Sequence, residues 1–336
     1  LLYKQRYGEI YSKKYSFYSE NHHESLDEEL KKQNETLIKF VKFANQNSLF
    51  YQKKFELIDI DNFKGLSELE KLPIVTKEEL RSNISDVYTI APDDGIVSFT
   101  GGTTGKALEV VFTYDDFQER MAYLDAFKTK LGVEPFSAKK ATFSGRELVT
   151  NPNTKVFWRK NSAYNQTLYS TFHLNDKNLH LYVDDLNKLK PELINGFVSA
   201  IYEVANFIKL NNIKLIFRPK AIFTTSETLL PFHRELIESV FSSNVYNQYA
   251  SAEGAPFITE CIKGNLHYNL DTGVIENKED SEEILVTSFT THGTPLIRYD
   301  IGDMVKFEAG VCECGSRHPL VKEVKGRMVD YLQGSD

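Results

Sequence analysis

The stretch PKAIFTTSETLLPFHRELIESVFSSNVYNQY, residues 219–249, decides the fold class. Its two ends, PKAIFTTSE and NVYNQY, are rich in β-branched and aromatic residues and predict strands, and LLPFHRELIESVFSS between them predicts a helix. A strand, a helix and a second strand in this order are typical of a βαβ unit. The sequence therefore predicts an α/β fold with a largely parallel sheet.

Helix signals lie on the N-terminal side of this stretch. Apolar residues recur at helical spacing in residues 26–46, and residues 113–131 predict a helix that is capped near Asp115. Thr76 stands three residues before Glu79, which is the capping-box spacing of a helix start. These segments predict helices that cover the sheet.

Further elements come from the middle and the end of the chain. Residues 186–210 predict a second long helical region, interrupted by Pro191 and Gly196. EEILVTSF and PLIRYDIGDMVKF, after residue 280, predict additional strands with turn signals between them. The predicted architecture is α/β without an obvious flexible linker.

The composition limits the class of protein. The chain has 336 residues, 41% of them hydrophobic and 26% charged, and a formal net charge of −7. This acidic balance argues against a nucleic-acid or anionic-membrane partner, because such surfaces are bound by concentrated Lys and Arg. No apolar run approaches the ~20 residues that span a bilayer, and the start lacks the apolar core of a signal peptide, so we expect a cytoplasmic protein.

SFTGGTTGKALEVVF, residues 98–112, places glycines, threonines and a lysine between two predicted strands. Glycines let backbone N–H groups approach a ligand, and the hydroxyls and the lysine add donors, so the composition suits a polyphosphate. The Walker A motif does not fit, because Thr100 and Ala107 occupy its required Gly and Ser/Thr positions. On this stretch alone, a hairpin loop whose glycines serve turn geometry is an equal alternative.

The loop resembles the T-S-G-T-T-G-x-P-K signature of the adenylate-forming superfamily, which contains the acyl-CoA ligases and the carrier-protein adenylation domains. The matching residues are TGGTTGKAL, 100–108, although Leu108 stands where many members place the final lysine. The resemblance implies that the loop binds the triphosphate of ATP. The residues it implicates are Thr100, Gly101, Gly102, Thr103, Thr104, Gly105 and Lys106.

A second resemblance covers residues 225–253, where the family carries its adenine-binding segment and then N-x-Y-G-x-T-E. Tyr249 would stack on adenine, and Glu253 would bind Mg²⁺, a hard cation that prefers carboxylate oxygen. Ala250 and Ala252 depart from the pattern, so the α-phosphate contact would fall to Ser251 or to a backbone N–H. The nucleotide contacts implied by the resemblance are Ser226, Glu227, Asn247, Gln248, Tyr249, Ala250 and Ser251.

Two more motifs follow in family order. PLIRYDIGD resembles Y-R-T-G-D and places Asp303 where a carboxylate accepts hydrogen bonds from both ribose hydroxyls, although Asp300 replaces the family's Arg. GRMVD resembles G-R-x-x-D, which implies a ribose or phosphate contact by Arg327 and a hinge at Asp330. Each motif is weak alone, but their order along the chain is strong evidence.

From about Phe99 to Asp330 the chain most resembles the branch of this superfamily that contains phenylacetate-CoA ligase, coenzyme F390 synthetase and CapK. The resemblance implies the large N-terminal domain of the adenylate-forming fold, with mostly parallel sheets covered by helices and a smaller β subdomain at about 255–325. We expect residues 1–90 to form a helical segment on the core of an AMP-binding domain at 91–330. Residues 331–336 would be a hinge to a C-terminal lid domain that the sequence lacks.

The resemblance also implies the activity. A carboxylic acid would react with ATP to give an acyl-adenylate and pyrophosphate, and the acyl group would then pass to CoA, to the pantetheine of an acyl carrier protein, or to an amine. Without the lid, this chain should bind ATP or acyl-AMP but adenylate poorly. A nucleotide-binding scaffold that has lost catalysis and a phosphotransferase are the alternatives. Candidates for the lining of an acyl pocket are Arg146, Trp158, Arg159, His173 and Phe197. For each of them we favour the alternative, which is core packing or a satisfied surface group.

The chain has three cysteines, which cannot all pair with one another and therefore predict no disulfide framework. Cys261 and His267 are spaced as C-x5-H, and Cys312 and Cys314 as C-x-C. Thiolates and imidazole match tetrahedral zinc, so these residues predict a structural zinc site, with His318 as the substitute if His267 points away. The alternatives are a buried hydrophobic Cys261 and an unmetallated C-x-C pair.

Overall fold

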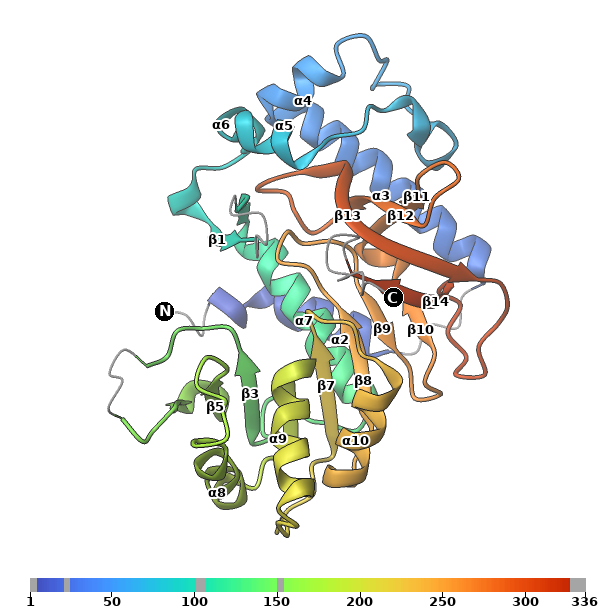
Figure 1. Ribbon diagram of the computed structural model, residues 1–336. Coiled ribbons are helices and arrows are strands. Elements are labelled where there is room, and N and C mark those ends of the chain that lie inside the picture. Colours follow the sequence, from blue (N-terminus) through green and yellow to red (C-terminus); the bar gives the residue numbers. More distant parts are fainter. Residues whose placement is uncertain (1–4, 21–24, 101–106, 150–153, 327–336) are drawn as a thin grey trace, which may run out of the picture. The chain divides into compact units, whose positions relative to one another are not determined.

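A computed structural model describes residues 5–20, 25–100, 107–149 and 154–326 (Figure 1). The chain divides into two compact units, one formed by residues 1–124 and 250–336 and the other by residues 125–249. Each unit contains its own β-sheet.

The unit of residues 125–249 is a parallel sheet with helices. Its strands are β3 (Lys140–Ser144), β4 (Trp158–Asn161), β5 (Gln166–Ser170), β6 (Leu193–Phe197), β7 (Ala221–Thr225) and β8 (Val245–Tyr249), in the order β8-β7-β6-β3-β5-β4. Pairing is parallel except between β4 and β5. The helices are α8 (Leu179–Leu189), α9 (Val198–Leu210) and α10 (Pro231–Phe241). The predicted βαβ unit is β7, α10 and β8.

The central strands of this unit are buried because helices supply their packing partners. Ile194 and Ile222 are fully buried in one hydrophobic cluster with Ile201 of α9 and Ile237 of α10. Continuous apolar runs of this kind are characteristic of parallel strands that are covered on both faces. The cluster fixes the positions at which the strands end.

The prediction of one interrupted helical region at 186–210 is wrong. Helix α8 stops before Pro191, with Lys190 at φ 50°, and β6 then enters the sheet between β3 and β7 before α9 begins. The residue before proline is disfavoured in the helical conformation, which explains the stop. Gly196, at φ +146°, lies so close to the Phe143 carbonyl that an added Cβ would stand 1.9 Å from its oxygen. It is therefore a strand residue that permits close pairing.

The other unit combines an antiparallel sheet with N-terminal helices. Its strands are the hairpin β1 (Ile96–Phe99) and β2 (Glu109–Phe112), and β9 (Ile258–Glu260), β10 (Leu266–Tyr268), β11 (Gly273–Asn277), β12 (Glu283–Ser288), β13 (Leu296–Glu308) and β14 (Leu320–Lys325), in the order β11-β12-β13-β14-β10-β9. Helices that begin in this unit are α2 (Glu9–Ser19), α3 (Leu26–Asn47), α4 (Leu49–Lys54), α5 (Lys77–Ser82), α6 (Ile84–Val87) and α7 (Tyr114–Lys130). Short 3-10 turns span Gly65–Lys71, Pro92–Asp94 and Leu270–Thr272 in this unit, and Ser162–Tyr164 in the other.

Local signals position these helices. The predicted helix at 26–46 is α3, and the capping box of Thr76 and Glu79 is confirmed at the start of α5. Helix α7 is capped differently from the prediction: the Thr113 hydroxyl accepts from the Asp116 amide at 3.0 Å, and the Asp116 carboxylate accepts from the Thr113 amide at 3.2 Å. This reciprocal pair replaces Asp115, because a hydroxyl one residue before the helix reaches the free amides.

Long-range polar contacts join the N-terminal helices to the antiparallel sheet. The Gln33 side chain on α3 donates to the Gly273 carbonyl at 2.6 Å, and the Tyr51 hydroxyl on α4 donates to the Pro295 carbonyl at 2.8 Å. The segment 1–90 thus shares one unit with the β-rich segment 255–325. Among the described residues, no helix combines the length and the apolar character needed to cross a membrane.

Candidate functional site

The strands on either side of the glycine loop pair as an antiparallel hairpin in which Phe99 lies opposite Glu109. Beyond this pair, the Thr100 amide donates to the Leu108 carbonyl at 3.0 Å, and the Leu108 amide donates to the Thr100 hydroxyl at 2.8 Å. Thr100 is 3% exposed, so it closes the base of the loop. The other loop residues implicated, Gly101, Gly102, Thr103, Thr104, Gly105 and Lys106, lie outside the described residues.

The residues of the unit 125–249 that the resemblance implicates in adenine binding gather at the carboxyl ends of two neighbouring parallel strands. Thr224 of β7 lies opposite Asn247 of β8, so Ser226 and Tyr249 follow at the same edge of the sheet. Open α/β sheets bind ligands at this edge. Ser226 adopts φ 68°, a left-handed conformation that is uncommon outside glycine and is often found at functional positions.

Glu227 has a structural partner that the sequence did not reveal. Its carboxylate accepts from the Ser199 amide at 2.6 Å and from the Ser199 hydroxyl at 2.8 Å, at the N-terminus of α9. A carboxylate here accepts a hydrogen bond from a free helix amide, and its negative charge interacts favourably with the positive end of the helix dipole. Gln248, by contrast, is 8% exposed, and its Oε1 has no hydrogen-bond partner in the described part of the chain. Strand alternation sends it to the face opposite Asn247 and Tyr249.

Four of the residues proposed for the acyl pocket have packing or polar partners within their unit. Trp158 and Phe197 pack against the hydrophobic cluster, and His173 Nδ1 lies 2.8 Å from the Ser170 hydroxyl. Arg146 is exposed. The guanidinium of Arg159 donates to the Trp158 carbonyl at 2.9 Å.

The segment that carries Glu253 is a turn without a helix or strand of its own. Its geometry is set by Ser251, whose hydroxyl accepts from the Gly254 amide at 3.1 Å and from the Ala255 amide at 2.9 Å. Glu253, between these anchors, is 3% exposed. The Ser251 hydroxyl thus acts as an acceptor within the turn. Its O–H group can still donate a hydrogen bond to a ligand.

Asp303 lies on a bulge of β13. Between the pairs Leu285–Asp300 and Glu283–Met304, β12 has one intervening residue, Ile284, whereas β13 has Ile301, Gly302 and Asp303. Gly302 adopts φ +79°, as such irregularities often require. Bulges re-aim side chains, and they are common next to active sites.

Asp300, at the position where the family has Arg, forms an ion pair instead. Its carboxylate accepts from Lys278 at 2.7 Å, and Lys278 also contacts Glu283 at 2.7 Å. Partial burial opposes the charge of Lys278, but the two carboxylates outweigh it and raise the pKa of this lysine. Arg327 and Asp330 lie outside the described residues.

The predicted zinc ligands come together. The ligand atoms of Cys261, His267, Cys312 and Cys314 all lie within 4.8 Å of one another. The Cys261 and Cys312 sulfurs are 3.8 Å apart, and Cys314 Sγ is 3.4 Å from His267 Nε2. A tetrahedron with zinc–sulfur bonds of about 2.3 Å has sulfurs about 3.8 Å apart, so the donor set fits zinc.

Surrounding groups orient these ligands. His267 Nδ1 donates to the His318 carbonyl at 3.0 Å, which directs Nε2 to the sulfurs. His318 is therefore the orienting residue and not the substitute ligand. Asn265 donates to Cys312 Sγ at 3.3 Å. Such outer contacts are typical of metal centres.

The same contacts favour a thiolate. Burial opposes ionisation of Cys312, yet hydrogen bonds from the Cys314 amide and the Asn265 side chain lower the pKa of its thiol to about 6. Burial, together with the neighbouring sulfurs of Cys312 and Cys261, raises the pKa of Cys314. A bound cation would remove this penalty, because metal ligation requires the thiolate form.

Comparison with known proteins gives a consistent result. No family model matches the chain. It is 38% identical over 313 residues to Protein CapK of Staphylococcus aureus, which covers 90% of this chain and 69% of that protein. It is 20% identical over 320 residues to the phenylacetate-coenzyme A ligase of Thermus thermophilus, which covers 89% of this chain and 70% of that protein.

A solved structure resembles this one in fold. The open conformation of 2-hydroxyisobutyryl-CoA ligase in complex with 2-HIB-AMP and CoA aligns with a TM-score of 0.70 and 16% identity, and the alignment covers 89% of this chain and 69% of that chain. At this identity the likeness shows the fold alone.

Proposed function

Because the chain belongs to the CapK and phenylacetate-CoA ligase branch of the adenylate-forming ligases, we propose that it activates a carboxylic acid with ATP. The observation that carries this proposal is the order of the four nucleotide motifs, from Thr100 to Arg327, in a chain that aligns with CapK over 90% of its length. The retained carboxylates Glu253 and Asp303 favour an active ligase over a scaffold. The adenylate-forming resemblance predicted from these motifs is confirmed.

The proposed reaction needs no side-chain base, because the substrate carboxylate is already an anion. One of its oxygens forms a bond to the α-phosphorus of ATP as the bond to the β-phosphate oxygen breaks, and pyrophosphate leaves. Lys106 and the hydroxyls of Thr103 and Thr104 would donate to the phosphates, where charge develops. Mg²⁺ bound at Glu253 would neutralise phosphate charge.

The remaining residues would bind the nucleoside. Tyr249 offers a flat aromatic face for adenine, and Asp303 offers two oxygens for the vicinal ribose hydroxyls. Positioning of this kind supplies a large share of the rate in phosphoryl chemistry. We propose CoA as the acceptor of the acyl group, because the related ligases are named for CoA; carrier-protein pantetheine or an amine would require only a different second-step partner.

A product assay tests this proposal. The full-length protein is incubated with Mg²⁺, ATP and a panel of aryl, fatty and amino acids, and pyrophosphate and ADP are both measured. Release of pyrophosphate that depends on one class of acid is the expected result. ADP release would identify a phosphotransferase, and absence of both products across the panel would favour the scaffold.

We also propose that Cys261, His267, Cys312 and Cys314 bind a structural zinc ion. The support is the fit of three thiols and one imidazole to tetrahedral zinc, together with the contact that orients His267. Protein purified without chelator should contain about one equivalent of zinc. Less than stoichiometric metal, with unchanged thermal stability after chelation, would reject the site.

A further inference from the structure

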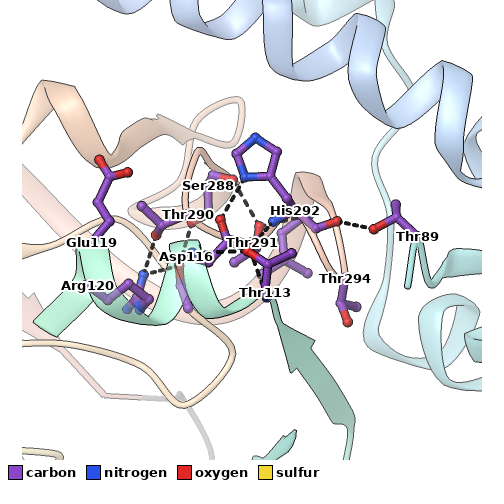
Figure 2. Close-up of polar contacts among 12 residues, drawn as sticks. Thr89, Thr113, Asp116, Glu119, Arg120, Ser288, Thr290, Thr291, His292 and Thr294 are labelled. Atoms are coloured by element: carbon purple, nitrogen blue, oxygen red, sulfur yellow. Dashed lines mark hydrogen bonds and ion pairs between the residues drawn. The ribbon is translucent and has the colours of Figure 1, made fainter. Parts of the chain in front are cut away.

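Arg120, drawn beside its partner Thr290 in Figure 2, holds the turn that carries Glu253. This arginine, on α7, is 5% exposed and therefore almost completely buried. Its Nη1 donates to the Gly254 carbonyl at 2.7 Å and to the Ala255 carbonyl at 3.2 Å, and its Nη2 donates to the Ala255 carbonyl at 3.3 Å. One guanidinium thus holds the two peptide carbonyls that directly follow Glu253.

The guanidinium is itself held in place. Nη1 also donates to the Thr290 hydroxyl at 2.8 Å, and the cation lies 4.4 Å from the ring centroid of Phe257. Tyr123 stacks on Phe257 with centroids 4.5 Å apart and planes 6° from parallel. A planar fork with several fixed donors suits this arrangement, and a lysine would lack the second nitrogen that donates to the Ala255 carbonyl.

A second donor acts on the same carbonyl. The Ser288 hydroxyl of β12 donates to the Gly254 carbonyl at 2.6 Å. Gly254 adopts φ +99°, and a Cβ there would come within 2.6 Å of the Thr291 methyl and 2.7 Å of the Phe112 ring. The backbone beside Glu253 is therefore fixed by donors on α7 and β12 and by a conformation that favours glycine.

Ser251 holds this turn through the Gly254 and Ala255 amides, and Arg120 holds it through the carbonyls of the same two residues. We infer that Arg120 is a positioning residue, which fixes Glu253 so that its carboxylate meets the metal of Mg·ATP. The inference rests on the proposed function, in which Glu253 binds Mg²⁺. Arg120 acts through the Gly254 and Ala255 carbonyls and need not touch the nucleotide.

The test measures the Mg²⁺ dependence of ATP binding, so that no carboxylic acid has to be known. The dissociation constant of ATP is determined calorimetrically with saturating Mg²⁺ and in metal-depleted buffer without chelator, which spares the Cys/His cluster. The constant without metal divided by the constant with Mg²⁺ gives the factor by which the metal strengthens ATP binding, and this ratio is compared between variants. Arg120→Lys should reduce this ratio about 10–100-fold, as loss of a group that orients a metal ligand commonly does. It should leave the metal-free constant unchanged.

Three further variants separate the possible causes. Ser288→Ala removes one donor from the Gly254 carbonyl and should reduce the ratio in the same direction by a smaller factor. Val41→Ala, at a fully buried position of α3, should lower thermal stability and leave the ratio unchanged. Glu253→Gln should remove the Mg²⁺ dependence of ATP binding. Adding Arg120→Lys to that variant should then change the ratio no further.

Each result decides between the metal-binding role of Glu253 and the positioning role of Arg120. If Glu253→Gln retains the wild-type ratio, the metal-binding assignment fails, and the proposed role of Glu253 fails with it. If Glu253→Gln loses the ratio but Arg120→Lys keeps it, only the positioning role of Arg120 is overturned. The same conclusion follows if Arg120→Lys weakens both constants equally, or if Val41→Ala reduces the ratio as much, because the arginine would then contribute only general stability.

Discussion

The Cys/His cluster and the nucleotide motifs place their residues in different ways. All ligands of the cluster belong to one unit, where pairing of β10 with β14 brings the β9–β10 turn beside the loop after β13. The nucleotide motifs are divided: Ser226 and Tyr249 belong to the unit 125–249, and Glu253 and Asp303 to the other. The cluster thus depends on the register of one sheet, whereas the proposed nucleotide site depends on motifs that are each positioned within their own unit.

This difference explains why the nucleotide residues have such specific local supports. Asp303 lies on a bulge, Ser226 has a left-handed backbone, and Glu253 lies on a turn fixed by Ser251 and Arg120. Each device fixes one side chain without help from the other motifs. The cluster instead has its ligands oriented by neighbours in the same unit, such as His318 in the segment before β14.

The largest effect is expected at Glu253, the proposed metal-binding carboxylate. Glu253→Gln keeps the size of the side chain but removes its charge, and pyrophosphate release should fall about 10²–10³-fold, the usual cost of losing one charge-stabilising group. Circular dichroism and thermal unfolding should remain close to wild type. Wild-type turnover would show that the carboxylate has been misassigned.

The cluster should respond through stability and metal content. Cys312→Ala should abolish stoichiometric zinc and lower the free energy of unfolding by about 3–5 kcal/mol, because the metal binds only the folded state. Val311→Ala, at the adjacent residue, which is 74% exposed, is the matched control and should change neither quantity. A Cys312→Ala protein with full zinc content would place the metal elsewhere.

Glu227 allows the two kinds of role to be separated at one residue. Ser199→Ala and Glu227→Gln each disturb the N-terminus of α9 and should cost about 1 kcal/mol in urea unfolding. Only Glu227→Gln should also weaken ATP binding, because the proposed adenine contact belongs to Glu227. Equal ATP affinities for the two variants would reduce Glu227 to a helix cap.

The smallest effect concerns His292, which pairs with Asp116 at 2.7 Å (Figure 2). Burial opposes the charge on this imidazole, but the Asp116 carboxylate outweighs burial and raises the pKa of His292. The stabilisation should be complete below the unfolded-state pKa of about 6.5 and be lost as the pH rises through the folded-state value. Because the side chain is 40% exposed, solvent screening should keep the effect below about 1 kcal/mol. Unfolding of wild type and His292→Gln at pH 5.5 and pH 8.5 measures it, and a larger difference at pH 8.5 would contradict the sign.

The sequence predicted what depends on local spacing. Residue types and short spacings predict the βαβ unit of residues 219–249 and the capping box at Thr76. They also predict that Cys261, His267, Cys312 and Cys314 come together. The strand at Leu193–Phe197 was missed, because the need for Gly196 arises only when β6 pairs with β3. Arg120 was missed for the same reason, since its carbonyl partners lie 134 and 135 residues away.

A structure determined with Mg²⁺ and ATP tests most directly whether the divided motifs serve one nucleotide. The adenine ring should stack on Tyr249, both ribose hydroxyls should donate to Asp303, and the metal should lie at Glu253. An adenosine bound away from Tyr249 and Asp303 would contradict the assignment of these residues to a common ligand.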